Sequence, residues 1–183
     1  MDSSHHVFLE IVLPSMAVAI NDRILDLGCG DGWASRKLAA LASEGMVVGI
    51  DSSGAAIREA RRLSSKFENI LYIEAEAEEN PWQDNFFSLA VLIDTLSAVH
   101  DVPATLRHLQ RVMSAGGQLW IVNQFARETG ASRVPALEAG MPDAEEYLKL
   151  LRAAGLVEPG CSVADGGTAA NAGTFLITAK KAF

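Results

Sequence analysis

The chain has 183 residues, a formal net charge of −8 and an apolar fraction of 49%. This length and hydrophobicity suit one folded domain and exclude a disordered chain. The acidic balance argues against binding to nucleic acids or anionic membranes, because both rely on clustered Lys and Arg side chains. No apolar run reaches the length of a transmembrane helix, and the N-terminus lacks the basic start of a signal peptide. We therefore expect a single domain over residues 1–183, located in the cytoplasm.

The two cysteines are also consistent with a location in the cytoplasm. Cys29 and Cys161 lie far apart in the sequence and in unlike surroundings. We expect both to be free thiols in a reducing environment. Neither has neighbours at the spacing of zinc ligands, so we expect no metal site.

Apolar residues recur along residues 5–20. They predict a helix, or two half-helices separated at Pro14. Two interpretations are open for this N-terminal segment, which spans residues 1–20. It could be a lid over a ligand site, or a helix packed on the edge of a sheet.

The stretch from Ile24 to Trp33 predicts a short buried strand, a glycine turn and the start of a helix. Gly28, Gly30 and Gly32 alternate, so the backbone can turn sharply and lie against a ligand with no Cβ between them. The next helix, expected over residues 34–42, points its free N–H groups at this loop. An ordinary turn needs only one of the three glycines, so we interpret the turn as a ligand-binding loop.

The spacing of the glycines helps to select the ligand. A dinucleotide-binding loop requires G-x-G-x-x-G. In this chain Trp33 stands at the third glycine position, and the glycine comes one residue early, at Gly32. Asp26 also precedes the loop, where a carboxylate would repel a pyrophosphate but would suit a ligand with a positive end.

The run D-L-G-C-G-D-G at residues 26–32 resembles the first motif of the class I S-adenosylmethionine-dependent methyltransferases. The similarity extends over roughly residues 23–179. It implies S-adenosylmethionine as the cofactor, a sulfonium cation with an amino acid tail, a ribose and an adenine. The residues of the motif that the resemblance places at the cofactor are Asp26, Gly28, Cys29 and Gly30.

A second short strand is expected over residues 46–50, and Asp51 follows it. Asp51 lies about 20 residues beyond the loop, the offset at which a carboxylate reaches the ribose hydroxyls in nucleotide-binding βαβ units. It could also stand at the start of the next helix, with Ser52 or Ser53 as the cap, and the two roles are compatible. We place Asp51 and Ser52 in the predicted cofactor site.

After a helix over residues 54–65 and a strand over residues 69–74, an acidic segment is similar to the third motif of the family. The resemblance implies that Glu76 accepts a hydrogen bond from the adenine amino group and that the N–H of Ala77 faces the ring. The family more often has Asp at this position, and Glu78 is a rival for the role. The alternative interpretation is an acidic surface loop.

The apolar run at residues 87–93 predicts a buried strand, although the family usually has an acidic residue where this chain has Ser88. Ligands in open α/β sheets bind outside the carboxyl ends of the strands. We therefore expect Asp94, which follows the strand, where methyl donor and acceptor meet, as a cofactor-binding or catalytic residue. Asp94 could instead cap the short helical turn after it. His100 could act as a general base, or it could have a structural role only.

The rest of the chain completes an alternation of strands and helices. We expect a helix over residues 103–114, a turn at 114–117, a strand over 118–123, a helix over 143–154, and strands at 161–163 and 174–179. Residues 124–142 are expected to form the acceptor-site connection, in which Arg127 and Arg133 could hold an acceptor carboxylate.

The alternation alone predicts a doubly wound α/β sheet. The resemblance narrows this to a Rossmann-like three-layer α/β/α sandwich with a seven-stranded, mostly parallel sheet and an antiparallel last strand. It also implies methyl transfer from S-adenosylmethionine to a small-molecule acceptor by in-line displacement, for which alignment of donor and nucleophile is the main requirement. Two alternatives are open. One is a non-catalytic module that binds S-adenosylmethionine or S-adenosylhomocysteine and acts through a partner protein; the other is an NAD-dependent oxidoreductase, against which Trp33 counts.

Overall fold

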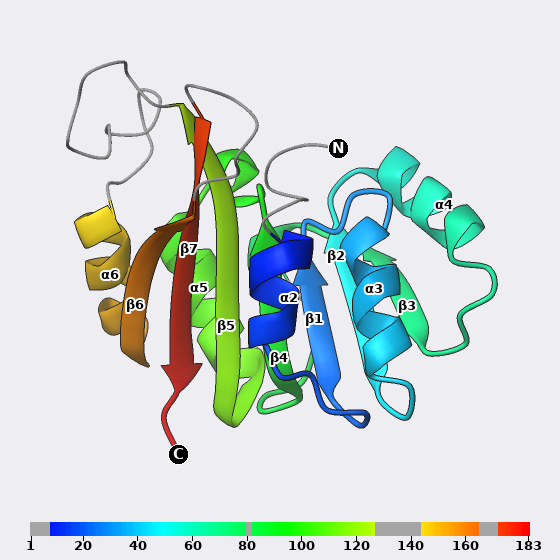
Figure 1. Ribbon diagram of the computed structural model, residues 1–183, viewed down its shortest axis with the longest axis horizontal. Coiled ribbons are helices and arrows are strands. Elements are labelled where there is room, and N and C mark those ends of the chain that lie inside the picture. The colour runs from blue at the N-terminus through cyan, green and yellow to red at the C-terminus, as the bar shows by residue number, and fades with distance from the viewer. Residues whose placement is uncertain (1–7, 80–81, 127–143, 165–171) are drawn as a thin grey trace.

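The computed structural model describes residues 8–79, 82–126, 144–164 and 172–183 (Figure 1). The strands are β1 (Arg23–Leu27), β2 (Met46–Asp51), β3 (Ile70–Glu74), β4 (Phe87–Ile93), β5 (Met113–Ala126), β6 (Leu156–Ala164) and β7 (Ala172–Lys181). The helical elements are η1 (Phe8–Val12), α2 (Leu13–Ser15), α3 (Trp33–Leu41), α4 (Gly54–Leu63), η2 (Ala77–Glu79), η3 (Leu96–Ala98), α5 (Val102–Val112) and α6 (Ala144–Ala153). The strands and the longer helices expected from the sequence are present. Most of the expected acceptor-site connection lies outside the described residues.

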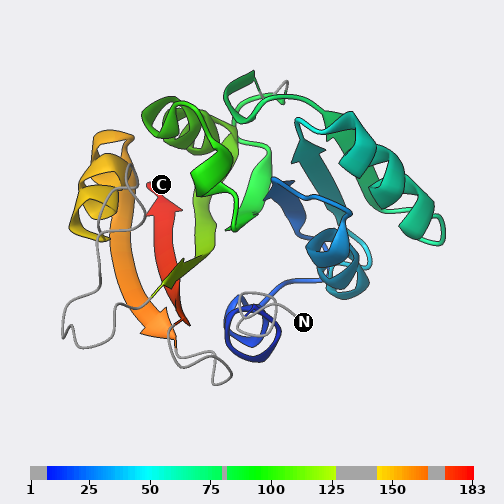
Figure 2. The same ribbon diagram turned by 90° about the horizontal axis from the view of Figure 1, so that it is seen from above.

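The seven strands form one mixed sheet in the order β3-β2-β1-β4-β5-β7-β6. β7 is antiparallel to both of its neighbours, whereas the pairs from β3 to β5 are parallel. Figure 2 shows α5 and α6 on one side of the sheet and the N-terminal helical turns on the other. The expected three-layer sandwich with an antiparallel last strand is confirmed.

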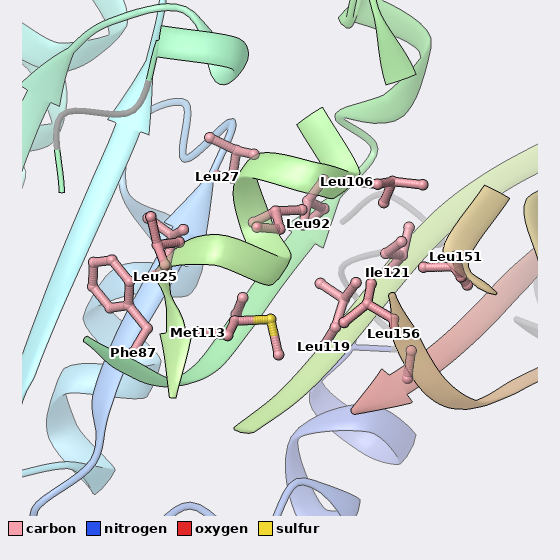
Figure 3. Close-up of a cluster of buried hydrophobic side chains, with 14 of the residues drawn as sticks. Leu25, Leu27, Phe87, Leu92, Leu106, Met113, Leu119, Ile121, Leu151 and Leu156 are labelled. Atoms are coloured by element: carbon pink, nitrogen blue, oxygen red, sulfur yellow. The ribbon is translucent and has the colours of Figure 1, made fainter. Parts of the chain in front are cut away.

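Two buried clusters lie on opposite faces of the sheet. In the first, side chains of β1, β2, β4 and β5 pack against α5 and α6 (Figure 3). In the second, side chains of the same four strands pack against η1, α2 and α3. Because successive residues of a strand point to opposite faces, the nearly continuous apolar runs of these strands fill both clusters.

The N-terminal turns pack on a face of the sheet and not on its edge. Phe8, Val12 and Met16 are each at most 2% exposed and belong to the cluster that contains α3. The ring of Phe8 meets that of Trp33 edge-on, with centroids 5.8 Å apart. The segment therefore supports the start of α3, and closure over a ligand stays a prediction.

Strand β5 contains an irregularity that the sequence predicted as a separate turn. Met113 pairs with Phe87, and the register then shifts before Gln118 pairs with Leu89. Residues 114–117 are thus a bulge inside a longer strand. In the described ranges, none of the helices combines the length and the apolar character that a membrane span needs.

Candidate active site

The glycine turn between β1 and α3 has the conformation that the sequence predicts. Gly28, Gly30 and Gly32 have φ angles of 75°, 53° and 76°. A Cβ on Gly28 would overlap the side chain of Thr95, and a Cβ on Gly32 would overlap that of Tyr72. A Cβ on Gly30 would meet no atom within 4 Å. Gly30 therefore faces open space, and its bare backbone lets a ligand approach the loop closely.

Asp51, at the end of β2, holds the loop in place. Its Oδ2 accepts a hydrogen bond from the N–H of Gly30 at 2.9 Å, and its Oδ1 accepts one from the N–H of Ser53 at 2.8 Å. Ser53 is the N-cap of α4, and its hydroxyl accepts from the N–H of Ala56 at 3.3 Å. The prediction of a serine cap beside Asp51 is confirmed. Each carboxylate oxygen has a further lone pair for a ligand hydroxyl, so the ribose role of Asp51 stays compatible with this geometry.

Asp26 is a buried carboxylate behind the loop. Its side chain is 1% exposed, and Oδ2 accepts a hydrogen bond from the hydroxyl of Ser35 at 2.5 Å. Burial raises the pKa of Asp26 to about 6, with a smaller contribution from the charge of Asp51, although the bond from Ser35 lowers it. At neutral pH the carboxylate is largely ionised, and a cationic ligand group beside it would lower its pKa.

Cys29 contributes to the loop through its backbone and its packing. Its N–H donates to the carbonyl of Ile50 at 3.0 Å, and its carbonyl accepts from the N–H of Gly32 at 2.9 Å. The side chain is 8% exposed and packs with Tyr72 and apolar residues of α4. Burial raises the pKa of this thiol far above its ordinary value, so it stays protonated and unreactive.

Two hollows flank the carboxyl ends of β1, β2 and β4, and both are lined by Gly28, Ile93 and Asp94. The first is lined in addition by the predicted site residues Asp51, Ser52, Glu76 and Ala77. The second is lined in addition by Asp26, Cys29, Gly30, Asp31, Trp33 and Ala34. The structure thus brings together every predicted cofactor-site residue, with Asp94 among them, but not His100. Arg127 and Arg133, predicted for the acceptor, lie outside the described residues.

The acidic segment after β3 lies beside the first hollow. Ala77 begins η2, and Glu76 and Glu78 both line the hollow. The rival carboxylate, Glu78, accepts a hydrogen bond from the N–H of Asp101 at 3.0 Å and so holds the start of α5. Glu76 is the exposed carboxylate of the pair, and its assignment to an adenine stays a prediction.

Asp94 lies where the two hollows meet. It has a positive φ of 51°, and its N–H donates to the carbonyl of Val122 at 2.8 Å. Thr95 holds the N-cap position of η3 without a capping bond from its side chain, and the alternative interpretation of Asp94 as a cap stays a prediction. The hydroxyl of Thr95 lies 3.0 Å from the carbonyl of Leu27 and 3.1 Å from that of Ile93. This hydroxyl joins the end of β4 to the end of β1.

His100 lies outside the two hollows and is exposed. It precedes Asp101, the N-cap of α5, whose Oδ1 accepts from the N–H of Ala104 at 2.8 Å. Its position gives no support to the prediction of a general base.

Three supporting side chains of the loop were not predicted from the sequence. Thr95 and Ser35 make the contacts described above, and the hydroxyl of Tyr72 donates to the carbonyl of Gly32 at 3.5 Å. The same hydroxyl lies 2.8 Å from the Oγ of Ser64. The one available signal was a hydroxyl within otherwise apolar strand or helix residues, which is too common to identify a site.

Comparison with known proteins agrees with this geometry. Residues 20–155 match the family model described as a methyltransferase domain. The chain belongs to this family, which confirms the family expected from the glycine motif.

Two curated relatives are also named as methyltransferases. The chain is 31% identical over 127 residues to the ubiquinone/menaquinone biosynthesis C-methyltransferase of Pectobacterium carotovorum, covering 67% of this chain and 50% of the relative. It is 32% identical over 123 residues to the 2-phytyl-1,4-naphtoquinone methyltransferase of Synechococcus elongatus, covering 65% and 53%. The chain therefore spans about half the length of these curated relatives.

A solved structure shows the same fold. The crystal structure of a SAM-dependent methyltransferase from Aquifex aeolicus superimposes with a TM-score of 0.74, covering 97% of this chain and 98% of that one. At 20% sequence identity, the likeness is one of fold.

Proposed function

We propose that the protein transfers a methyl group from S-adenosylmethionine to a small-molecule acceptor by in-line displacement. The observation that carries this proposal is the open face of Gly30, which has no atom within 4 Å of its Cβ position. Gly30 is bonded to the carboxylate of Asp51, and it lines the same hollow as the buried carboxylate of Asp26. This combination suits a ligand that is cationic at one end and carries hydroxyl groups further along.

The lining of the two hollows fits the parts of this cofactor. Asp26 would face its amino group, the backbone of Gly28 and Gly30 would support the amino acid tail, and Asp51 with Ser52 would bind the ribose. For the adenine, the first hollow offers a carboxylate, a backbone N–H and apolar walls. The residues that we assign to the adenine are Glu76, Ala77, Ile50 and Val99.

The chain's own residues would then position the acceptor and exclude water. The cofactor, when bound, supplies a methyl group activated by positively charged sulfur. Asp94 lines both hollows and so lies between cofactor and acceptor, where its carboxylate can orient a donor group of the acceptor or take up a proton from it. Holding the reacting atoms about 3–3.5 Å apart and in line supplies most of what such a displacement needs. Several relatives are named for quinone substrates, which supports a small-molecule acceptor.

We also place the protein in the cytoplasm. Both cysteines, Cys29 and Cys161, are free thiols, and burial raises the pKa of each. Thiols of this kind suit a reducing compartment.

Calorimetric titration with S-adenosylmethionine, S-adenosylhomocysteine and NAD tests the proposal. We expect micromolar binding of the first two ligands and no binding of NAD. Asp51→Asn removes a charged hydrogen-bond acceptor from the ribose and from the loop, so we expect affinity to fall about 10- to 100-fold. Glu68→Gln, at an exposed carboxylate away from the two hollows, should leave affinity unchanged.

Two outcomes would contradict parts of this proposal. Tight binding of NAD without either adenosyl ligand would favour an oxidoreductase. Binding of the adenosyl ligands without methyl transfer to a broad panel of hydroxyl, amine and thiol acceptors would favour the non-catalytic module.

A further inference from the structure

The side chain of Asn123 is a buried amide to which the proposed cofactor site gives no role. It is 6% exposed, and its Oδ1 is enclosed without a hydrogen-bond donor among the described residues. Buried side-chain polar atoms in folded proteins nearly always have a partner. A ligand that brings a donor to this oxygen would supply the missing hydrogen bond.

The sheet places Asn123 beside Asp94. Parallel pairing aligns Ile93 of β4 with Val122 of β5, and the N–H of Asp94 donates to the carbonyl of Val122 at 2.8 Å. Asn123 is the next residue of β5 after this contact. It therefore stands at the carboxyl edge of the sheet, next to Asp94, which lines both hollows.

The side chain of Asn123 also lies on the appropriate face. Ile121 belongs to the cluster beneath α5 and α6, and alternation along the strand puts Asn123 on the same face. Leu27 and Ile50, which line the first hollow, belong to that cluster as well. Asn123 thus lies on the same face of the sheet as these two lining residues, beside the first hollow and not in its wall.

A second buried polar atom without a partner lies on this face. The hydroxyl of Tyr147, in α6, is enclosed and has no hydrogen-bond partner in the part of the chain that the structure describes, and the side chain is 3% exposed. Burial raises the pKa of Tyr147 to about 12, with a smaller contribution from Glu146, so the phenol keeps its proton and can donate it in a hydrogen bond. Tyr147 belongs to the same cluster as Ile121.

Because α6 and β5 run in opposite directions, the start of α6, which carries Tyr147, lies toward the same edge of the sheet as Asn123. Leu151 of α6 and Ile121 of β5 lie in the same cluster (Figure 3). β5 and β6 are parallel, so α6, which connects them, runs in the opposite direction. Tyr147 is about 6 Å before Leu151 along the helix, and Asn123 is about 6.6 Å beyond Ile121 along the strand. Both steps lead toward the carboxyl edge.

We propose that Asn123 and Tyr147 form a specificity site for the methyl acceptor, with Asn123 Oδ1 accepting a hydrogen bond from a hydroxyl group of the acceptor and Tyr147 Oη donating one to an acceptor oxygen. Both atoms are uncharged, both side chains are buried, and Tyr147 belongs to the apolar cluster beneath α5. Such surroundings disfavour an ionised group without a counter-charge. The substrate class is therefore a neutral, largely apolar molecule that carries a hydroxyl group. This inference rests on the proposed function and names the substrate class of the same site.

The test uses two probes that differ in one O–H donor, 1-naphthol and 1-methoxynaphthalene. Each is titrated into the full chain saturated with S-adenosylhomocysteine. We expect the wild type to prefer 1-naphthol about tenfold, because an unsatisfied buried acceptor discriminates against the ligand that lacks the donor. Asn123→Leu and Tyr147→Phe should each weaken 1-naphthol binding about tenfold, and Asn123→Leu should abolish the preference. Affinity for S-adenosylhomocysteine should stay unchanged in both variants.

Thermal unfolding of the ligand-free chain separates this role from a structural one. Replacing an unsatisfied amide by an apolar group of similar shape should leave Tm unchanged or raise it. Asn69→Leu is the matched control, because the Nδ2 of Asn69 donates to the carbonyls of Ala39 and Ala42 at 3.0 and 2.9 Å. We expect this control to lower Tm. Tyr147→Phe removes one hydroxyl only and tests the same idea with the smallest change in volume.

Three results would overturn the inference. One is a wild type with no preference for 1-naphthol, and another is a preference that survives in Asn123→Leu. The third is a fall in Tm in Asn123→Leu and Tyr147→Phe as large as in Asn69→Leu, which would give both groups a role in the fold. A wild type that does not bind S-adenosylhomocysteine would contradict the proposed function itself.

Discussion

The side chain of Asp26 is buried, and burial favours its neutral, protonated form over the charged carboxylate. The pKa of Asp26 is about 6 in the folded chain, against an ordinary value of 3.8, because burial disfavours the charge. The folded chain therefore binds this proton more tightly than the unfolded chain does. The resulting stabilisation is present below about pH 4 and is lost as the pH rises through about 6.

Asp26→Asn should remove this dependence. At pH 7.5 we expect the free energy of unfolding of the ligand-free chain to rise by about 2–3 kcal/mol, since each unit of pKa shift corresponds to about 1.4 kcal/mol. Affinity for S-adenosylhomocysteine should fall, because the variant lacks the carboxylate that we assign to the amino group of the ligand. Urea unfolding at pH 4.5, 6.0 and 7.5, with calorimetry at pH 7.5, measures both effects.

The exposed carboxylate of Glu44 supplies the control for this variant. Glu44→Gln should keep the wild-type dependence of stability on pH between 4 and 6. If Asp26→Asn also keeps it, another group is responsible for the dependence.

Replacing Gly28 or Gly30 of the loop by alanine should affect stability and ligand binding to different degrees. Gly28→Ala combines a φ of 75° with overlap of Thr95, so we expect it to destabilise the chain by more than about 2 kcal/mol. Gly30→Ala has only the unfavourable φ of 53°, which costs about 1–2 kcal/mol, but its methyl group would enter the open space that we assign to the ligand. We expect at least tenfold weaker binding of S-adenosylhomocysteine in Gly30→Ala. Unfolding curves and calorimetry on both variants measure this, and wild-type affinity in Gly30→Ala would contradict our placement of the ligand.

Sequence reasoning identified the residues of the loop but not the side chains that support it. Asp26, Gly30 and Asp51 stand at spacings that a local pattern reveals. Thr95 and Asn123 matter because the register of β4 against β1 and β5 places them at the carboxyl edge, and register is a property of the assembled sheet.

The contacts of Ser88, near the start of β4, offer another example. Ser88 accepts a hydrogen bond from the N–H of Arg23 at 3.1 Å and donates one to Oδ1 of Asp22 at 2.7 Å. The hydroxyl therefore links β4 to the residues at the start of β1. The sequence around Ser88 does not reveal this contact, because it depends on the pairing of the two strands.

The N-terminal turns are an element whose role can be tested by itself. Phe8 is fully buried against Trp33, at the start of α3. Phe8→Ala should destabilise the chain by about 3–5 kcal/mol. It should also weaken binding of S-adenosylhomocysteine, because Trp33 lines the second hollow and loses its neighbour.

Ile11 lies on the same turn and is 41% exposed, so Ile11→Ala is the matched control. We expect it to change stability by less than about 0.5 kcal/mol. Urea unfolding and calorimetry apply to both variants. A Phe8→Ala chain that is destabilised but binds the ligand normally would limit the segment to a structural role.

The bounds of a strand were predicted well where the apolar residues of that segment alone define it. They were predicted less well where pairing with another strand lengthens it. β1, β2 and β4 are short apolar runs, and their bounds follow from composition. β6 and the end of β5 are longer than expected because β7 pairs with both strands. The start of β5 is extended by the pairing of Met113 with Phe87 of β4. Pro159 would ordinarily argue against a strand, but β6 is an edge strand and its register shifts at that point.

On the scale of the whole molecule, three unfavourable features meet at the carboxyl edge of the sheet. Asp26 is a buried charge, Asp94 has a left-handed backbone, and Asn123 has an unsatisfied oxygen. The two apolar clusters on the faces of the sheet supply the stability that tolerates them. Strain held at one edge by a well-packed sheet is typical of a site that a ligand completes.

Ligand binding at this edge should therefore stabilise the entire chain. At a concentration of S-adenosylhomocysteine 100 times its Kd, we expect a gain of about 2.7 kcal/mol in the free energy of unfolding. For a domain of this size the gain corresponds to a rise in Tm of roughly 5–10 °C. Tm should continue to rise with the logarithm of ligand concentration, whereas NAD should cause no rise. Asp51→Asn at the same ligand concentration should show a smaller shift. A Tm that does not respond to saturating S-adenosylhomocysteine would mean that the carboxyl edge is not where this ligand binds.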